Sequence, residues 1–359
     1  MNGTNHSHRL LSLDILRGIT VAGMILVNHS YGDTFTPLQH SAWNGMTPCD
    51  LVFPFFLYIM GISTYLSLRK YQFQWSRQAA SKILRRTVLI FLIGLCINWL
   101  SNISYGDWQW SHLRIMAVLQ RIALCYGLVS LLALSVNHKY LLHVCVGLLI
   151  AYTVILFLGN GYAEDATNLA SRLDTMILGT DHLYHHTPID PEGLLGTLPA
   201  VAHTLIGFLC GRAMMQETKT ETRVLRFLLY GGILVIGGYL LSFGLPLNKC
   251  IWSPSYVLVT CGLASLLQGI LMYNIDIRGH KRWTLFFLVF GINPLFLYVL
   301  SEVMSIFLDA VGASDVIYQS IHAVVTDNCW ASLCFALTHV LICGVVGWVL
   351  YRSKVFIKI

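Results

Sequence analysis

The stretch QHSAWNGMTPCDLVFPFFLYIMG, residues 39–61, changes from polar to apolar after Asp50. Its second half, extended to residue 68, has the length and composition of a membrane-spanning helix, which needs roughly 20 apolar residues. The whole chain shares this character, because 56% of its 359 residues are hydrophobic and only 11% are charged. Soluble globular domains are far richer in charge. The sequence therefore predicts an integral membrane protein.

Similar apolar windows recur along the chain with short polar interruptions. They predict an all-α, polytopic integral membrane protein with about ten transmembrane helices, at residues 15–32, 50–68, 84–101, 115–135, 140–158, 196–215, 226–244, 255–274, 284–308 and 331–351. The ninth window is long enough to be tilted, kinked at Asn293-Pro294 or split, which leaves eleven helices open. No separate soluble domain fits between the windows, so we expect residues 1–359 to form one transmembrane domain.

The N-terminal apolar window does not read as a cleaved signal peptide. Asp14 and Arg17 interrupt what would be its apolar core, and it lacks the basic start that a signal peptide has. We therefore expect the first span to be retained in the protein.

Basic residues follow alternate loops of this predicted topology. If the N-terminus is cytoplasmic, the cytoplasmic segments hold 18 of the 23 Lys and Arg residues, and short cytoplasmic loops carry such an excess. We expect both termini in the cytoplasm and His40 on the other side. The net charge of +6 thus reflects topology. Because the cations are spread over several loops without interleaved aromatic residues, we expect no nucleic-acid partner.

The ten cysteines give little support to metal or redox chemistry. Most fall within predicted spans and none forms a CxxC pair, so we expect no metal site. Cys250 and Cys329 are both expected on the outer side, where a disulfide between them is permitted. The chain also lacks a usable GxSxG elbow, Walker-type loop or HExxH motif.

Charged residues within membrane spans cost about 2.5–3.5 kcal/mol each on insertion scales, so they usually pair or line a cavity. Asp14 and Arg17 are three residues apart and share one helix face. They form either a structural ion pair or a site in which Arg17 faces an anionic cofactor. Arg114 and Arg121 are two helical turns apart, with Gln120 adjacent. Snorkelling explains Arg114 but not the deeper Arg121, and two guanidiniums could together bind a phosphate.

The polar segment before the second span brings together Asn28, His40, Asn44 and Asp50 in a single turn between two helices. Asp50 also has a structural alternative, because Thr47 or Asp50 could cap the second helix. A neutral histidine can accept a proton or be acylated, and a nearby carboxylate can fix its tautomer. This segment is therefore a candidate catalytic site centred on His40.

Asp190 and Glu192 precede the predicted helix 196–215. Carboxylates in this position can simply stabilise a helix N-terminus. His203 lies inside the same span, where it is either a buried, hydrogen-bonded histidine or a ligand contact.

Several segments together resemble the heparan-alpha-glucosaminide N-acetyltransferase family of transmembrane acyltransferases. They run in family order from residue 12 to residue 301, and they are SLDILRGITVAGMILVN, HSAWNGMTPCDLVFPFFLYIMGIS, LRIMAVLQRIALCY, DPEGLLGTLPAVAHTLIGFLCG, LNKCIWSPSYVLVTCGLA and GINPLFLYVLS. The second segment is the most specific. The chain looks like a compact bacterial member, which implies a location in the bacterial inner (plasma) membrane.

The resemblance implies transfer of an acetyl group from cytoplasmic acetyl-CoA to an amino sugar on the extracytoplasmic side, such as the glucosamine of a heparan-type or related glycan. It places the family's active histidine on His40, and Asn28 and Asp50 also match the family pattern. It further implies acetyl-CoA as co-substrate, a glycan acceptor, contact with membrane lipids and a homodimer. The acceptor stays open between glucosamine, another amino sugar and a hydroxyl of a cell-envelope glycan.

In this hypothesis His40 is the general base or a transiently acetylated nucleophile, Asp50 orients it, and Asn44 or Asn28 holds the thioester or the acceptor. The candidates for binding acetyl-CoA are Arg17, Arg114, Gln120, Arg121 and Asn293. The candidates for binding the acceptor are Trp43, Asp190 and Glu192.

Two other functions remain open from the residues alone. Intramembrane charged residues also suit a transporter or flippase, although no inverted repeat is detectable in the sequence. A structural or regulatory membrane subunit is the third alternative.

Overall fold

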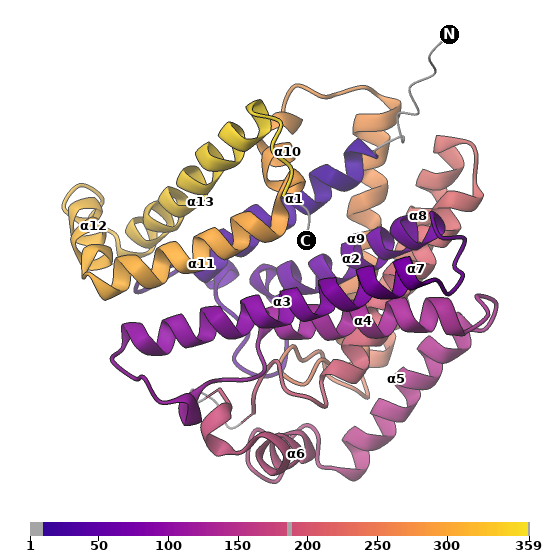
Figure 1. Cartoon of the computed structure of the whole chain (residues 1–359), viewed down its shortest axis with the longest axis horizontal. Coiled ribbons are helices and arrows are strands. Elements are labelled where there is room, and N and C mark those ends of the chain that lie inside the picture. Colours follow the sequence, from indigo (N-terminus) through magenta and orange to yellow (C-terminus); the bar gives the residue numbers. More distant parts are fainter. Residues whose placement is uncertain (1–9, 185–188, 358–359) are drawn as a thin grey trace.

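The computed structural model of the chain describes residues 10–184 and 189–357. These residues form helices and loops without strands (Figure 1), and the α-helices are α1 Leu11–Asn28, α2 Val52–Arg69, α3 Arg77–Ser104, α4 Val118–Ser135, α5 Leu141–Leu158, α6 Leu169–Leu178, α7 Thr197–Gln216, α8 Thr220–Ser242, α9 Pro254–Met272, α10 Thr284–Ile292, α11 Pro294–Ala310, α12 Ala313–His322 and α13 Asn328–Arg352. Nine helices within the described residues are long and apolar enough to cross a membrane, or ten if α10 and α11 form one span. The predicted all-α polytopic fold is confirmed.

The ninth predicted span is split. Helices α10 and α11 meet at 85° around Asn293, where Pro294 has no N–H to continue the hydrogen-bond ladder of α10. The Asn293 amide instead binds the C-terminal segment, donating to the Val355 carbonyl at 3.0 Å and accepting from the Ile357 N–H at 2.9 Å. The window is thus broken at Asn293-Pro294, and its two helices together count as at most one span.

Three predicted spans begin at least four residues too late in the sequence, among them the seventh, which was expected at 226–244 and is α8 Thr220–Ser242. The first was expected at 15–32, but α1 begins four residues earlier because Asp14 and Arg17 pair at 2.8 Å and are accommodated within the helix. The structural ion pair considered for these two residues is thus present. The third was expected at 84–101, but α3 includes the cationic turns before it, beginning after Ser76, whose side chain caps the helix by accepting from the Ala79 N–H.

Two short helices lie outside the predicted spans. Helices α6 and α12 have ten residues each, about 15 Å, which is too short to cross a membrane. The Asn168 side chain caps α6, and Gly179 ends it with φ +88°, a conformation that favours glycine. Both helices lie at the margin of the bundle (Figure 1), and both belong to loops that the topology places on the same side as His40.

Helices α1, α2, α4, α7 and α9 form the interior of the bundle, whereas the faces of α3, α5 and α8 are largely exposed. Close approach of α2 and α7 depends on glycine: a Cβ at Gly61 would lie 2.1 Å from the Thr204 carbonyl, and one at Gly207 would lie 2.1 Å from the Tyr58 carbonyl. Small residues commonly permit such contact between membrane helices. The exposed apolar faces outside this core suit contact with lipid acyl chains.

Contacts between loops divide the bundle into two ends. Segments 29–47, 105–117, 159–184, 189–196, 243–253 and 311–327 meet at one end, which we call the His40 end. They are joined by contacts such as His40–Lys249, Trp43–Tyr162 and Arg114–Glu192. The predicted alternation of spans places these same segments together. The other end, which we call the opposite end, contains the start of α3. Which end faces the cytoplasm stays a prediction.

Candidate active site

The catalytic candidate Asp50 sits in the short 3-10 helix Pro48–Leu51 that leads into α2. Its Oδ2 accepts hydrogen bonds from the Ser41 N–H at 3.1 Å and the Thr47 N–H at 3.0 Å, and the Thr47 hydroxyl lies 3.1 Å away. Thr47 and Asp50 thus form the capping box that the sequence offered as a structural alternative. The carboxylate is fully buried, and its other oxygen remains for a second partner.

That second partner is His40. The Asp50 Oδ1 lies 2.7 Å from the His40 Nδ1, while the imidazole itself is 53% exposed. A proton on Nδ1 shared with the carboxylate leaves the Nε2 lone pair available for chemistry. Asp50 therefore has both roles considered from the sequence, because one oxygen caps a helix and the other orients His40.

Lys249 completes this cluster and was missed by the sequence analysis. Its Nζ lies 3.0 Å from the His40 Nδ1, 3.1 Å from the His40 Nε2 and 3.7 Å from the Asp50 Oδ1. A single lysine outside a span carries no motif, although LNKCIWSP was among the segments that carried the family resemblance. The ammonium places a positive charge beside the exposed ring of His40.

The loop of His40 is fastened to the loop of Lys249. The Gly45 N–H donates to the Leu247 carbonyl at 2.7 Å, and the Asn248 amide donates to the Asn44 Oδ1 at 3.3 Å. Asn248 is fully buried, so it fixes the backbone next to Lys249. Asn44, a catalytic candidate, thus contacts the neighbouring loop and positions the site.

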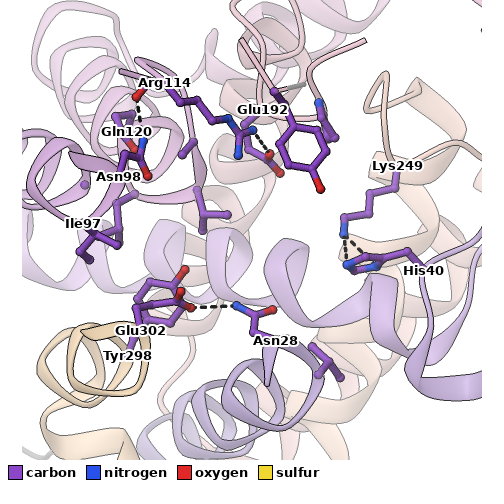
Figure 2. A pocket seen from close by; sticks show the side chains of 17 residues that line it. Asn28, His40, Ile97, Asn98, Arg114, Gln120, Glu192, Lys249, Tyr298 and Glu302 are labelled. Atoms are coloured by element: carbon purple, nitrogen blue, oxygen red, sulfur yellow. Dashed lines mark hydrogen bonds and ion pairs between the residues drawn. The ribbon is translucent and has the colours of Figure 1, made fainter. Parts of the chain in front are cut away.

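The exposed edge of His40 faces a cavity of about 520 Å³, which we call the His40 cavity (Figure 2). The residues that line it are Val27, Asn28, His40, Gly94, Ile97, Asn98, Arg114, Ala117, Val118, Leu119, Gln120, Tyr184, Pro191, Glu192, Lys249, Tyr298 and Glu302. Five candidate residues are therefore brought together, namely Asn28, His40, Arg114, Gln120 and Glu192. The other candidates are not part of this lining among the described residues: Arg17, Trp43, Asn44, Asp50, Arg121, Asp190 and Asn293.

Asn28 and Glu302 form a polar pair on the wall of this cavity. The Asn28 amide donates to the Glu302 Oε1 at 3.1 Å, as Figure 2 shows. Glu302 comes from α11 and was missed by the sequence analysis, although an acidic residue within a predicted span is itself a signal of function. The pair offers a carboxylate and an amide to a ligand that enters the cavity.

Arg114 forms ion pairs with both acidic candidates. Its Nη2 lies 2.7 Å from the Asp190 Oδ1 and 2.8 Å from the Glu192 Oε2. Burial by itself would raise the pKa of Glu192, but the neighbouring Arg114 outweighs it and holds that pKa below its ordinary value. Glu192 is therefore charged at neutral pH, and the two ion pairs hold Arg114 in place.

Gln120 and Arg121 face different surroundings. Gln120 lines the cavity and is fully buried, and neither its amide oxygen nor its nitrogen has a hydrogen-bond partner. Arg121 is also fully buried, donates to the Gly193 carbonyl at 2.9 Å and lies 5.2 Å from the ring of Trp252. Buried polar groups are normally satisfied, so Gln120 is the candidate best placed to contact a ligand.

The remaining candidates have contacts elsewhere in the fold. Trp43 packs at the His40 end and donates to the Tyr162 carbonyl at 3.0 Å. Arg17 bonds to Ser63 at 2.9 Å and to the Gly291 carbonyl at 3.2 Å. His203, the second histidine considered from the sequence, is fully buried within α7. The ligand-binding roles of Trp43 and Arg17 stay predictions.

A second cavity lies at the opposite end, where the start of α3 meets the end of α2. This cavity, which we call the cationic cavity, has a volume of about 670 Å³. The residues that line it are Tyr71, Arg77, Gln78, Ser81, Lys82, Arg85 and Arg86. Four of these residues are basic and none is acidic. The first turn of a long helix also favours anions. The sequence analysis used these cations for topology and named none of them among the candidates for binding acetyl-CoA.

Cys250 and Cys329 are free thiols, so the disulfide considered from the sequence is not formed. Burial raises the pKa of Cys250 to about 11, which keeps this thiol protonated at neutral pH.

The sequence matches a family model described as heparan-alpha-glucosaminide N-acetyltransferase, catalytic, over residues 9–243. The human heparan-alpha-glucosaminide N-acetyltransferase is 30% identical, over 98% of this chain and 60% of the human protein. The mouse protein of the same name is 27% identical, over 98% of this chain and 61% of its own length. The chain thus spans about 60% of the length of these curated relatives. With more than half of its residues matched by the family model, the chain belongs to the heparan-alpha-glucosaminide N-acetyltransferase family.

Proposed function

We propose that this protein transfers an acetyl group from acetyl-CoA to the amine of an amino sugar at the His40 end. The observation that carries the proposal is the His40–Asp50–Lys249 cluster on the wall of a 520 Å³ cavity, in a chain that belongs to an acetyltransferase family. Membership of this family favours acyl transfer over the transporter and the structural-subunit alternatives.

His40 is the group that handles the proton. With Nδ1 bonded to Asp50, the Nε2 of His40 takes a proton as the acceptor amine attacks the thioester carbonyl; the new C–N bond forms, the C–S bond breaks and CoA leaves as a thiol after protonation. In the alternative route Nε2 attacks the thioester carbonyl first, the C–S bond breaks and CoA leaves. The amine then attacks the acetyl-imidazole, whose acyl C–N bond breaks and returns its electron pair to Nε2. Asp50 orients the ring in both routes.

Lys249 supports the same step through its charge. Attack on a thioester places negative charge on the carbonyl oxygen, and a fixed positive group within reach stabilises it. The Lys249 ammonium lies 3.1 Å from the Nε2 at which reaction occurs. Asn28 and Gln120 offer further amide donors on the cavity wall.

The donor reaches this site from the cationic cavity, where the phosphates of CoA meet Arg77, Lys82, Arg85 and Arg86. Helix α3 lines both cavities, with Lys82 at one and Ile97 at the other. Fifteen residues of helix separate these two positions by about 22 Å. CoA carries its thioester at the end of a long, thin arm, so one donor molecule suits this arrangement. Arg114 and Gln120 are then placed near the acetyl end of the donor.

The test is acetyl transfer from radiolabelled acetyl-CoA to glucosamine by the purified full-length protein, compared with a folded, monodisperse His40→Ala variant. We expect transfer by the wild type alone. Equal transfer by both proteins would remove His40 from the mechanism, and no transfer to any amino sugar or glycan would overturn the proposal. Label that stays on the wild-type protein in the absence of acceptor, and is lost in His40→Ala, would select the acetyl-histidine route.

A further inference from the structure

The His40 end of the molecule is strongly acidic. Of the 17 Asp and Glu residues, ten lie in the segments that form this end: Asp33, Asp107, Glu164, Asp165, Asp174, Asp181, Asp190, Glu192, Asp315 and Asp327. Three more adjoin its cavities, because Asp50 contacts His40, Glu302 lines the His40 cavity and Asp309 lines the cavity next to it. The basic residues of the same segments are Arg114, Arg172 and Lys249. A surface with such an excess of one charge attracts ligands of the opposite sign and repels those of the same sign.

The basic residues at the cavity are already engaged by carboxylates. Arg114 pairs with Asp190 and Glu192, and Lys249 lies between His40 and Asp50. Neither is left as an unpaired cation that would recognise a sulfate or a carboxylate on a sugar. The excess of negative charge at this end therefore remains uncompensated by the chain.

A third cavity adjoins the His40 cavity, because Asn28 lines both. It has a volume of about 360 Å³, and we call it the Asp315 cavity. Asp309 and Asp315 are its charged residues, Tyr31 and Tyr105 add aromatic rings, and none of its described lining residues is Lys or Arg. The Tyr31 hydroxyl donates to Asp315 and the Ser314 hydroxyl donates to Asp309. A carboxylate accepts several hydrogen bonds, so both can also bind donors of a ligand.

We propose that the acceptor is a neutral or cationic amino glycan of at least two sugars, with its reacting amine in the His40 cavity and the adjoining sugar in the Asp315 cavity. The inference rests on the acetyltransferase function proposed above and specifies its substrate class. Hydroxyl and ammonium groups are donors that match the carboxylates of Asp309, Asp315 and Glu302. A sulfated or uronic-acid sugar at the same place would bring like charges together, and such an arrangement selects against it.

Four acceptors with the same terminal glucosamine test this assignment on the full-length wild-type protein. They are the monosaccharide, a glucosamine trisaccharide, a disaccharide in which glucosamine is linked to a uronic acid, and the same disaccharide with an O-sulfate. At low ionic strength we expect kcat/KM to be highest for the trisaccharide and lowest for the sulfated disaccharide, with about tenfold or more between them. Added salt should lower the first value and raise the last, because screening weakens both attraction and repulsion.

Two variants locate the effect. The double variant Asp309→Asn, Asp315→Asn should lower kcat/KM for the trisaccharide several-fold more than kcat/KM for the monosaccharide, which does not reach the Asp315 cavity. The control is Glu164→Gln, which removes one negative charge from the same end outside both cavities and should keep the preference for the trisaccharide.

The outcomes separate this inference from the proposed function. Transfer that favours the sulfated or uronate-linked disaccharide would overturn the inference and leave the acetyltransferase function standing. A wild-type preference for the trisaccharide that is insensitive to salt and to the double variant would also overturn it. No transfer to any of the four acceptors would overturn the function itself.

Discussion

The two ends of α3 carry cavities of comparable size in surroundings of opposite charge. The cationic cavity of about 670 Å³ is lined by four basic residues and no acidic one. The His40 cavity of about 520 Å³ is lined by two basic and two acidic residues, and the segments around it hold ten acidic residues and three Lys or Arg. The basic excess at one end could be read as topology alone. Topology alone does not account for a cavity at each end, nor for the acidic excess at the His40 end. These two features favour two ligands of different charge that approach from opposite ends of the bundle.

The largest effect is expected at Asp50, whose two oxygens have separate roles. Asp50→Asn should lower kcat by about 10²–10⁴-fold, because His40 loses the carboxylate that orients it. Thr47→Ala removes the capping side chain and leaves the His40 contact, so it should cost about 1 kcal/mol of stability and little activity. Steady-state kinetics with thermal unfolding of the same samples would separate the two. Equal activity losses in both variants would mean that Asp50 acts only by holding the fold.

Lys249 is expected to give the next largest effect. Lys249→Met should lower kcat by about 10²–10³-fold if the ammonium stabilises the oxyanion, and Lys249→Arg should restore part of it because the charge is kept. The matched control is Lys219→Met, which removes an exposed lysine at the opposite end. Wild-type kcat in Lys249→Met would show that the contact with His40 is incidental to the reaction.

Lys249 also shows where sequence reasoning reached its limit. Periodicity and composition predicted the spans because each depends on about 20 consecutive residues, and His40 stood out through its polar neighbours. Lys249 is 209 residues from His40 and enters the site only because Asn248 and Gly45 fasten two loops together. No local pattern contains that information. The family resemblance included the segment around Lys249 but gave it no role.

The candidates for binding acetyl-CoA show a second limit of reasoning from sequence. Arg17, Arg114 and Arg121 were selected because charges within or near spans are costly and need a partner. The structure supplies partners within the protein, namely Asp14 for Arg17, Asp190 and Glu192 for Arg114, and the Gly193 carbonyl for the Nη2 of Arg121. The Nε and Nη1 of Arg121 are buried without a hydrogen-bond partner among the described residues. A sequence signals that such a charge must be paired, but not whether the partner is a ligand or another part of the chain.

A buried carboxyl group at the His40 end, that of Asp174, should make the stability of the protein depend on pH. Burial raises the pKa of Asp174 in α6 to about 6 from 3.8, so the folded state holds this proton more tightly than the unfolded state does. The protonated Asp174 carboxyl group therefore adds to the free energy of unfolding at low pH. This addition is lost as the pH rises from about 4 to about 6, by up to about 3 kcal/mol. Asp174→Asn should therefore raise the unfolding temperature relative to wild type at pH 8 more than at pH 4. The exposed control Asp181→Asn should follow the wild type, and identical pH profiles in all three proteins would contradict the assignment.

The smallest effect is expected at the cationic cavity, where the charges of Arg77, Lys82 and Arg85 are exposed and screened. Arg85→Gln should raise the KM for acetyl-CoA by about two- to fivefold, the range of an exposed ion pair, and leave kcat unchanged because the site lies far from His40. The effect should shrink at high salt, and Lys219→Gln, which removes a charge at the same end outside this cavity, should not reproduce it. Measurement in detergent and in nanodiscs of neutral lipid distinguishes CoA from an anionic lipid headgroup as the natural occupant. If Arg85→Gln leaves the KM unchanged in both but weakens binding of vesicles rich in anionic lipid, the cavity serves the membrane, and the donor must reach His40 by another route.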